Sequence, residues 1–454
     1  MPNQFFNKVV KTKAWVVAVD MGYGHQRAAY PLKTFALGNR IINANNYAGI
    51  PRSDRKIWQM SRNFYEYISR FTTTPIVGKK AFEIYDKNFQ GIPAFYPKRD
   101  LSKPSFQLRT IYQTMKKKNW GKDLIIRLEK NPLPLVTTFF VPAYMAEYFK
   151  YSGDIYLLIC DTDVSRAWAS LHPNTSKIKY LAPSRRVVER LQLYGVKPGK
   201  IFLTGFPLPL ENLGDYKLAG LRKDFGQRLP NLDPENIYIS KYESTIKKHL
   251  GSKNFKTKSS HKLNLMFAVG GAGAQRGLAI EIATSLKEKI IRDKIMVTLV
   301  AGIHNDVYSY FKRELKKIGL ASAVGRKIKI IFSGNKEDYF RKFNLALKTT
   351  DILWTKPSEL SFYCALGLPI IIAPPIGEQE IFNQRWLEGI GAGISQDNPK
   401  HASEWLFDWI NSGWLAEAAM QGYLEASKFG TYNIERVMAK KPEEAMRVET
   451  VLQY

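Results

Sequence analysis

The chain has 454 residues, of which 45% are hydrophobic and 24% charged, and it carries a formal net charge of +28. This length predicts two or three domains, and the composition is that of a globular protein with hydrophobic cores. It excludes a disulfide framework, because the only cysteines, Cys160 and Cys364, fall in apolar segments and are expected to be buried thiols in a reducing cytosol. We expect neither a signal peptide nor a transmembrane helix, because no apolar run approaches the ~20 residues that such a helix needs.

The positive charge is concentrated in the first third of the chain. Residues 1–150 contain 25 Lys and Arg residues against 9 Asp and Glu residues. Such an excess indicates nucleic acid, an anionic membrane surface or phosphorylated ligands as partners. It also exceeds what solubility alone requires.

The segment 51–130 interleaves these basic residues with aromatic ones, and helices are expected at 54–70, 78–88 and 104–119. Three interpretations are open: stacking platforms for nucleic acid, a membrane-interface surface, or helix cores with solvated faces. The sequence has no RNA-recognition signature, zinc-finger spacing or helix-turn-helix pattern, which counts against a dedicated nucleic-acid binder.

The first predicted strand, Trp15–Val19, leads directly into Gly22, Gly24 and His25. Glycines between a strand and a helix allow a tight turn and a close approach of the backbone to a ligand. His25 is then either a candidate general base or an exposed, helix-capping residue.

Two series of alternating strands and helices follow, with a domain boundary between 207 and 262. Strands are expected at 135–140 and 155–159 in the first series, and at 263–269, 295–300 and 328–332 in the second. Helices are expected at 214–225, 234–250, 277–291, 336–348 and within about 401–440. Because each series opens with a glycine-rich loop after a strand, the sequence predicts an α/β protein with two Rossmann-like domains facing a cleft.

The segment 349–387 holds the densest set of candidate binding residues. A strand at 351–354 is followed by the turn Lys356-Pro357-Ser358, one or two helical turns at 359–366 and a second strand at 368–373. Ligands of open α/β sheets bind beyond the carboxyl ends of the strands, and a helix N-terminus there favours phosphate. Serine, carboxylate and amide side chains at two such ends suit the hydroxyls of a ribose or a sugar, although two ordinary polar turns would look the same.

The order of these residues resembles a known family. Lys356-Pro-Ser358, Gly-Leu-Pro, an apolar strand and Gly-x-Gln379-Glu380-x-x-Asn383 are similar to the nucleotide-sugar site of certain GT-B glycosyltransferases. These are the peptidoglycan N-acetylglucosaminyltransferase and the monogalactosyl- and diglucosyl-diacylglycerol synthases. The family usually has a ribose-binding Glu where this chain has Phe362, and Glu359, three residues earlier on the same helical face, is the candidate substitute.

Further motifs of the family occur in the N-terminal half. Gly22-x-Gly24-His25-x-x-Ala-Ala resembles its acceptor-side loop, and a strand that ends in Asp161 with Trp168 seven residues on is also similar. The run from Gly195 to Pro207 matches its Gly-Val-x-Pro-x-Lys-Ile…Thr-Gly-x-Pro pattern. The resemblance spans roughly residues 14–30 and 155–390.

The resemblance implies an inverting, metal-independent transfer of a hexose or N-acetylhexosamine. The donor would be a nucleoside diphosphate sugar, with UDP as the expected nucleotide, and the acceptor a hydroxyl, expected to be lipid-linked. No cofactor and no metal are implied, because Asp161-Thr-Asp163 matches the non-metal aspartate of the family. In the implied site, His25 or Asp161 is the base, and Gly22, Gly24 and Trp168 lie on the acceptor side. The residues implied to bind the donor are Gly271, Ala272, Gly273, Ser358, Glu359, Gln379, Glu380 and Asn383.

The same reasoning assigns an acceptor domain to 1–207 with a helical insert at about 50–130, an interdomain segment to 208–262 and a donor domain to 263–400. Helices in 401–454 would pack back toward the first domain. A cytoplasmic protein bound peripherally to an anionic membrane surface is expected, with a lipid or glycan acceptor and no dedicated nucleic-acid partner. Alternatives are a nucleotide-sugar 2-epimerase and a degenerate, non-catalytic carbohydrate-binding protein, the latter because of Phe362.

Overall fold

The computed structural model describes residues 12–71, 91–270, 273 and 275–439. The chain forms two compact units. Unit 1 consists of Met1–Pro207, Ile376–Asn383 and Phe429–Tyr454, and unit 2 of Leu208–Pro375 and Gln384–Lys428. Each unit contains one six-stranded, entirely parallel sheet with helices, which confirms the prediction of two Rossmann-like domains.

The sheet of unit 1 has the strand order β2-β1-β3-β4-β5-β6. Its central strands are apolar on both faces, as parallel strands covered by helices must be. The prediction for 135–140 was too long at its end, because Phe140 already begins a helix. The strands are β1 (Ala14–Ala18), β2 (Ala36–Asn43), β3 (Leu135–Thr137), β4 (Ile155–Leu158), β5 (Lys179–Ala182) and β6 (Ile201–Leu203).

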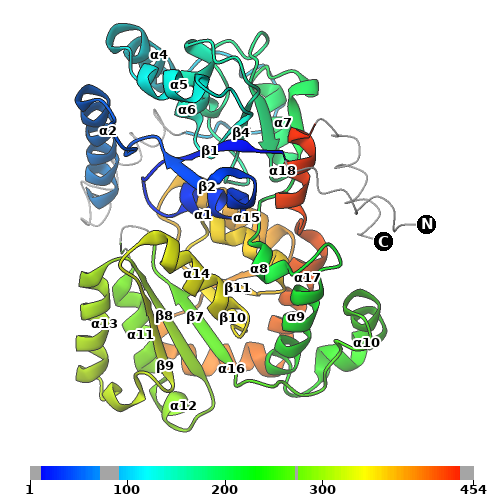
Figure 1. Cartoon of the computed structure of the whole chain (residues 1–454). Helices are drawn as coiled ribbons and strands as arrows, with labels where there is room; N and C mark the ends of the chain where they lie inside the picture. Colours follow the sequence, from blue (N-terminus) through cyan, green and yellow to red (C-terminus); the bar gives the residue numbers. More distant parts are fainter. Residues whose placement is uncertain (1–11, 72–90, 271–272, 274, 440–454) are drawn as a thin grey trace. The chain divides into compact units, whose positions relative to one another are not determined.

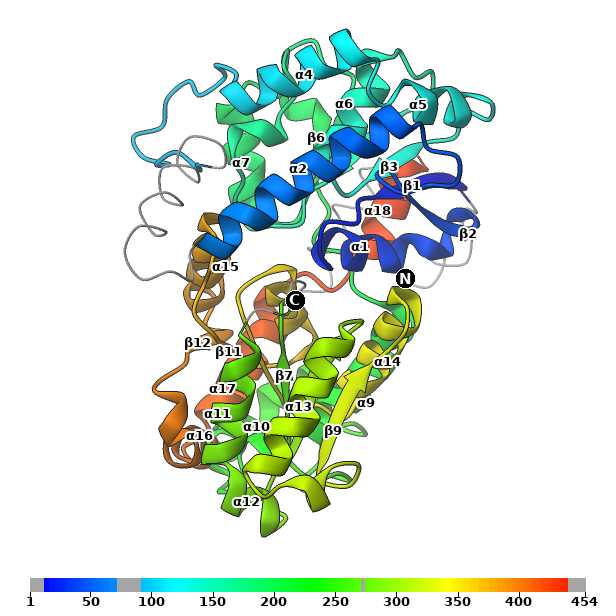
Figure 2. The same cartoon turned by 90° about the vertical axis from the view of Figure 1, so that its left-hand side faces the viewer.

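Two of the three helices expected in the basic segment 51–130 lie among the described residues, and the structure contains both of them. The long helix α2 (Arg52–Phe71; Figure 2) contacts the segment that begins α5, where Trp58 and Trp120 pack with ring centroids 4.8 Å apart. The buried Asp54 carboxylate accepts a hydrogen bond from Gly121 N at 3.0 Å, and burial raises the pKa of that carboxyl. The helix expected at 78–88 lies outside the described residues. The other helices of unit 1 are α1 (Gly24–Ala29), α4 (Phe106–Lys118), α5 (Lys122–Glu129), α6 (Phe140–Tyr148), α7 (Arg185–Leu193) and α18 (Gly430–Met438).

The sheet of unit 2 has the order β12-β11-β10-β7-β8-β9. Figure 1 shows β8 and β9 lying between α13 (Asn305–Lys317) and α14 (Lys336–Leu347). The helical turns expected at 359–366 are a 3-10 helix, and the helix expected at 277–291 is divided at Leu286. The strands are β7 (Asn264–Ala268), β8 (Met296–Gly302), β9 (Ile328–Phe332), β10 (Ile352–Thr355), β11 (Ile370–Ile372) and β12 (Gly393–Ser395).

The remaining helices of unit 2 flank this sheet in the sequence. They are α8 (Leu210–Leu213), α9 (Ala219–Leu232), α10 (Ile237–Leu250), α11 (Arg276–Ser285), α12 (Lys287–Ile291), α16 (Ala402–Asn411) and α17 (Trp414–Glu425), and α15 (Glu378–Gly389) is shared between the units. Among the described residues, no helix is both long enough and apolar enough to span a membrane.

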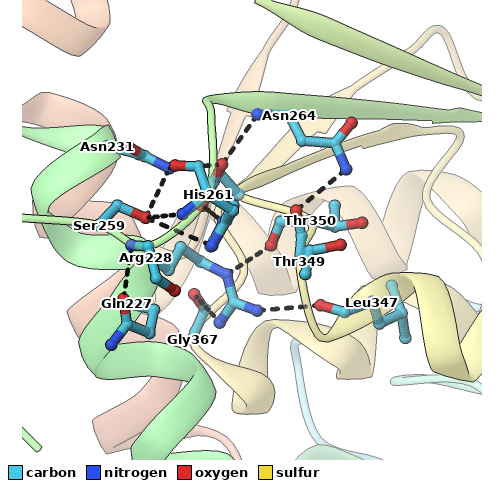
Figure 3. Close-up of polar contacts among 12 residues, drawn as sticks. Gln227, Arg228, Asn231, Ser259, His261, Asn264, Leu347, Thr349, Thr350 and Gly367 are labelled. Atoms are coloured by element: carbon cyan, nitrogen blue, oxygen red, sulfur yellow. Dashed lines mark hydrogen bonds and ion pairs between the residues drawn. The ribbon is translucent and has the colours of Figure 1, made fainter. Parts of the chain in front are cut away.

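A buried arginine on α9 joins the segments of unit 2 that carry the candidate donor residues (Figure 3). The Arg228 guanidinium donates hydrogen bonds to four carbonyl groups. These carbonyl oxygens belong to Leu347, at the end of α14, and to Leu366 and Gly367, at the end of the 3-10 helix, with Thr350 as the fourth. Carbonyls at helix ends lack partners within the helix, so one cation satisfies two helix ends at once. Burial lowers the pKa of Arg228 to about 10.

The buried Asp351 carboxylate, at the amino end of β10, closes the same network. It accepts hydrogen bonds from Asn264 N at 2.8 Å, from Asn231 Nδ2 at 3.1 Å and from the His261 ring at 3.0 Å. Burial raises the pKa of this carboxyl, while the His261 contact opposes the shift. The network thereby fastens the chain before β7 to the start of β10.

Candidate functional site

The glycine-rich loop of unit 2 follows β7 and leads into α11. Gly273 has φ +70°, and a Cβ at this position would meet Val307 Cγ2 at 2.9 Å. Any other residue would therefore be strained in both conformation and packing. Gly273 N donates to Gly270 O at 2.8 Å, which closes the turn. Gly271 and Ala272, which the sequence also placed in the site, lie outside the described residues.

Lys356, which the sequence analysis placed in the turn after a strand but did not include among the site residues, lies against this loop. A Cβ built on Gly270 would meet the Lys356 side chain at Cε (2.8 Å), Cδ (3.4 Å) and Nζ (3.6 Å). Lys356 directly follows β10, the neighbour of β7 in the sheet, so the ends of both strands meet at this point. Its ammonium group adds positive charge beside the start of the loop that leads into α11, and such loops favour anions. A basic residue immediately after a buried parallel strand is the signal that could have identified it.

The loop is also tied to the next strand of the sheet. Gln275 Nε2 donates to the carbonyl oxygen of Pro374 at 2.8 Å, two residues beyond β11. The carboxyl ends of β7, β10 and β11 are therefore linked on one edge of unit 2. This is the edge at which ligands of parallel sheets bind.

Ser358 and Glu359 occupy the turn after β10, and both are partly exposed. Ser358 stands at the N-cap position of the 3-10 helix, but its hydroxyl makes no capping hydrogen bond. Phe362, at the position where the family has a glutamate, is 4% exposed, and its ring centroid lies 5.1 Å from that of Trp386. Because side chains three residues apart eclipse in a 3-10 helix, Glu359 shares a face with Phe362.

The polar residues expected beyond β11 do not all belong to the unit that the sequence analysis assigned them to. The structure groups 376–383, with Gln379, Glu380 and Asn383, into unit 1 rather than with the rest of the predicted donor domain. Gln379 is partly exposed. Glu380 is buried and accepts a hydrogen bond from Ile376 N at 2.8 Å.

His25 lies in the first turn of α1, directly after β1. Gly22, in the preceding turn, has φ +104°, which requires glycine. The His25 carbonyl accepts a hydrogen bond from Thr138 Oγ1 at 2.9 Å. The His25 ring packs on Phe139 at 4.8 Å and on Trp168 at 6.1 Å between centroids, so two residues chosen from the acceptor-side motifs lie together.

Asp161 follows β4, and the asparagine expected to bind the donor lies beside it. Asn383 is fully buried, and its Nδ2 donates to Asp161 Oδ1 at 3.0 Å. Its Oδ1 accepts bonds from Thr162 N and Thr162 Oγ1, both at 2.9 Å. One amide side chain therefore fixes both residues of this turn.

Asp163 has a structural role in the same turn. Both of its carboxylate oxygens accept hydrogen bonds from Arg190, at 2.8 and 2.9 Å, and both side chains are buried. Asp161 and Asp163 therefore have different partners despite the spacing of a metal motif. Among the described residues, no three His, Cys, Asp or Glu side chains gather in a way that would hold a metal ion.

The acceptor-side residues share one edge of the sheet of unit 1. β1 pairs with β3 and β3 with β4, all parallel, so His25, Thr138 and Asp161 follow three adjacent strands at their carboxyl ends. An imidazole and a carboxylate at such an edge can accept a proton from a hydroxyl group. Unit 2 instead presents the ammonium group of Lys356 beside Gly270, which suits an anion.

Comparisons with known proteins identify similar proteins over most of the chain. The chain is 22% identical over 387 residues to a processive diacylglycerol beta-glucosyltransferase of Bacillus subtilis. The aligned region covers 84% of this chain and 82% of that protein. A family model described as a domain of unknown function (DUF6938) matches residues 242–436.

Solved structures of low sequence identity are also similar. MurG of Acinetobacter baumannii covers 94% of this chain and 99% of its own, with 10% identity and a TM-score of 0.47. The UDP-GlcNAc 2-epimerase of Neisseria meningitidis, bound to UDP-GlcNAc, covers 80% and 84%, with 11% identity and a TM-score of 0.40.

Proposed function

We propose that the protein, which has two Rossmann-like domains and resembles processive diacylglycerol beta-glucosyltransferases in sequence, is a GT-B glycosyltransferase that transfers a hexose or N-acetylhexosamine from a UDP-sugar to a lipid-linked hydroxyl group. The observation that carries the proposal is the position of Lys356 against Gly270, where the glycine-rich loop and the end of β10 meet. A cation beside a glycine-rich loop and a helix N-terminus is suited to a diphosphate.

In this proposal the donor binds unit 2. The diphosphate lies against Lys356, the loop 270–273 and the start of α11, and Ser358 and Glu359 bind hydroxyl groups of the ribose or the sugar. When the sugar departs, negative charge grows on the diphosphate, and the Lys356 ammonium stabilises it without a metal ion. Glu359 takes the place of the glutamate that Phe362 replaces.

Unit 1 binds the acceptor and supplies the base. His25 or Asp161 removes the proton from the acceptor hydroxyl as its oxygen attacks the anomeric carbon on the face opposite the diphosphate, so the configuration inverts. Phe139 and Trp168 form the apolar wall beside His25. Such a wall suits the carbon-rich face of a sugar or the glycerol end of a lipid.

A lipid acceptor is supported by the surface of α4 and α5 and by the diacylglycerol named for the relatives. Phe106 is 68% and Ile126 54% exposed, and they are accompanied by the exposed lysines 116, 117, 118, 122 and 130. Each basic residue near an anionic leaflet contributes about 1 kcal/mol. We therefore propose peripheral binding to the anionic cytoplasmic face of a membrane.

The activity is tested with anionic vesicles that contain diacylglycerol and with UDP-glucose, UDP-galactose or UDP-N-acetylglucosamine as donor. We expect UDP to be released and a glycolipid to be detected by mass spectrometry. NMR of this product should show that the anomeric configuration of the sugar has been inverted. Conversion of the donor at C2 without any acceptor would instead identify an epimerase. A thermal-shift panel of uridine, guanosine and thymidine diphosphate sugars identifies the base.

Membrane binding is tested by co-sedimentation with anionic vesicles at low and high salt. Changing Lys116, Lys117 and Lys118 to Gln should weaken binding at low salt. The matched control changes three exposed lysines of α13, Lys312, Lys316 and Lys317, and should leave binding unchanged. Equal loss in both variants would refute a specific docking surface.

A further inference from the structure

We infer that Asn383 is a positioning residue for the Asp161 carboxylate rather than a ligand of the donor sugar, an inference that rests on the proposed transferase function and takes Asp161 rather than His25 as the base. The resemblance places Asn383 among the donor-binding residues. The structure instead buries it completely in unit 1, with its amide facing the turn after β4.

The amide group of Asn383 is engaged at both ends. Its Nδ2 donates to Asp161 Oδ1 at 3.0 Å, and its Oδ1 accepts from the Thr162 backbone and hydroxyl. These three contacts identify the orientation of the amide, because only Nδ2 can donate to a carboxylate and only Oδ1 can accept from a backbone N–H group. A donor hydroxyl would have to replace one of these buried bonds.

The turn that carries Asp161 is fixed on its other side by α7. Ser184 Oγ, at the N-cap of α7, donates to the Thr162 carbonyl at 3.2 Å. Asp163 is held by Arg190 from the same helix. The two residues that follow Asp161 are therefore held in place, and the Asn383 amide orients the carboxylate itself.

Holding a carboxylate through one oxygen orients the group and stabilises its ionised form, which a base requires. A hydrogen bond to a charged group contributes about 1.5–3 kcal/mol, which corresponds to roughly 10- to 100-fold in rate if it is formed in the transition state. Loss of the Asn383 donor should therefore lower kcat.

The test uses the isosteric variant Asn383→Asp, which still accepts from Thr162 but places an acceptor against Asp161. We expect kcat to fall roughly 10- to 100-fold while the KM for the UDP-sugar stays within about twofold of wild type. Gln379→Ala is the matched control on the same helix. It should raise the donor KM more than it lowers kcat, because Gln379 is partly exposed and assigned to the donor.

A second measurement needs no activity. The exchange variant Asp161→Asn/Asn383→Asp restores one donor and one acceptor between the two positions, so its thermal unfolding midpoint should exceed that of Asn383→Asp. It should remain inactive, because the carboxylate has moved from position 161 to position 383. The midpoint therefore tests whether the pair forms, and the kcat and KM of Asn383→Asp test whether the pair positions the base.

Two results would overturn the inference. A raised donor KM with unchanged kcat in Asn383→Asp would show that Asn383 binds the donor, and an exchange variant no more stable than Asn383→Asp would show that the pair does not form. A wild-type protein that binds no nucleotide sugar and transfers none would refute the proposed function, and with it the catalytic role. The midpoints would still decide whether the pair exists.

Discussion

Replacing Arg228 with methionine should destabilise unit 2 more than any other single loss of charge on α9. Methionine keeps most of the volume of the side chain but removes the donors to Thr350 O (2.7 Å), Leu366 O (2.7 Å), Gly367 O (3.1 Å) and Leu347 O (3.2 Å). Four hydrogen bonds from a charged group give an upper bound of about 6–12 kcal/mol. The loss is partly offset, because methionine does not have to be buried as a cation. In the wild type, burial of the guanidinium is unfavourable enough to lower the pKa of Arg228 to about 10.

The net loss should therefore be about 3–5 kcal/mol, the usual effect of removing one partner from a buried charged network. For a unit of this size the unfolding midpoint should fall by roughly 6–20 °C. Differential scanning calorimetry measures it, and the transition of unit 2 is recognised by its upward shift with added UDP. The UDP affinity should also decrease, because the 3-10 helix that begins at Glu359 ends at the carbonyls that Arg228 holds.

The matched control is Lys223→Met, which removes one positive charge from an exposed position of the same helix. It should leave the midpoint within about 2 °C of wild type, as surface substitutions usually do. A midpoint of Arg228→Met that also stays within about 2 °C of wild type would refute the argument that this arginine secures the donor side of unit 2.

Three further predictions concern single side chains. Lys356→Met should weaken UDP binding by roughly 10- to 100-fold in calorimetry, with Lys329→Met, an exposed lysine of β9, as the control. Burial and nearby cations lower the pKa of His249, so the unfolded chain takes up the proton first. Stability should therefore fall as the pH drops through about 6.5, and His249→Gln should flatten this dependence in urea unfolding. Burial raises the pKa of the Cys364 thiol, and Cys160 is also buried. Neither thiol should react with Ellman's reagent at pH 8 before unfolding, and rapid reaction of the native protein would contradict this.

The sequence by itself determined the elements whose pattern reflects their own burial. The apolar runs at β1, β4, β7 and β10 were visible because strands of a parallel sheet are covered on both faces. The glycine-rich turns after β1 and β7 were visible because positive φ angles, as at Gly22 and Gly273, require glycine. The edge strand β2 was missed, since its exposed residues Gly38, Asn39 and Arg40 interrupt the apolar pattern.

Only the tertiary structure decided which polar residues meet. Asn383 lies 222 residues from Asp161 in the sequence, and nothing in the pattern of either segment indicates that its amide turns toward that carboxylate. Lys356 likewise follows an ordinary buried strand, and its place beside Gly270 arises from the pairing of β10 with β7. Arg228 looks in sequence like a solvated helix residue, and its burial is accompanied by hydrogen bonds to carbonyls at the ends of two helices. Periodicity reports how deeply an element is buried, whereas the contacts between elements depend on strand order and packing, which one segment does not encode.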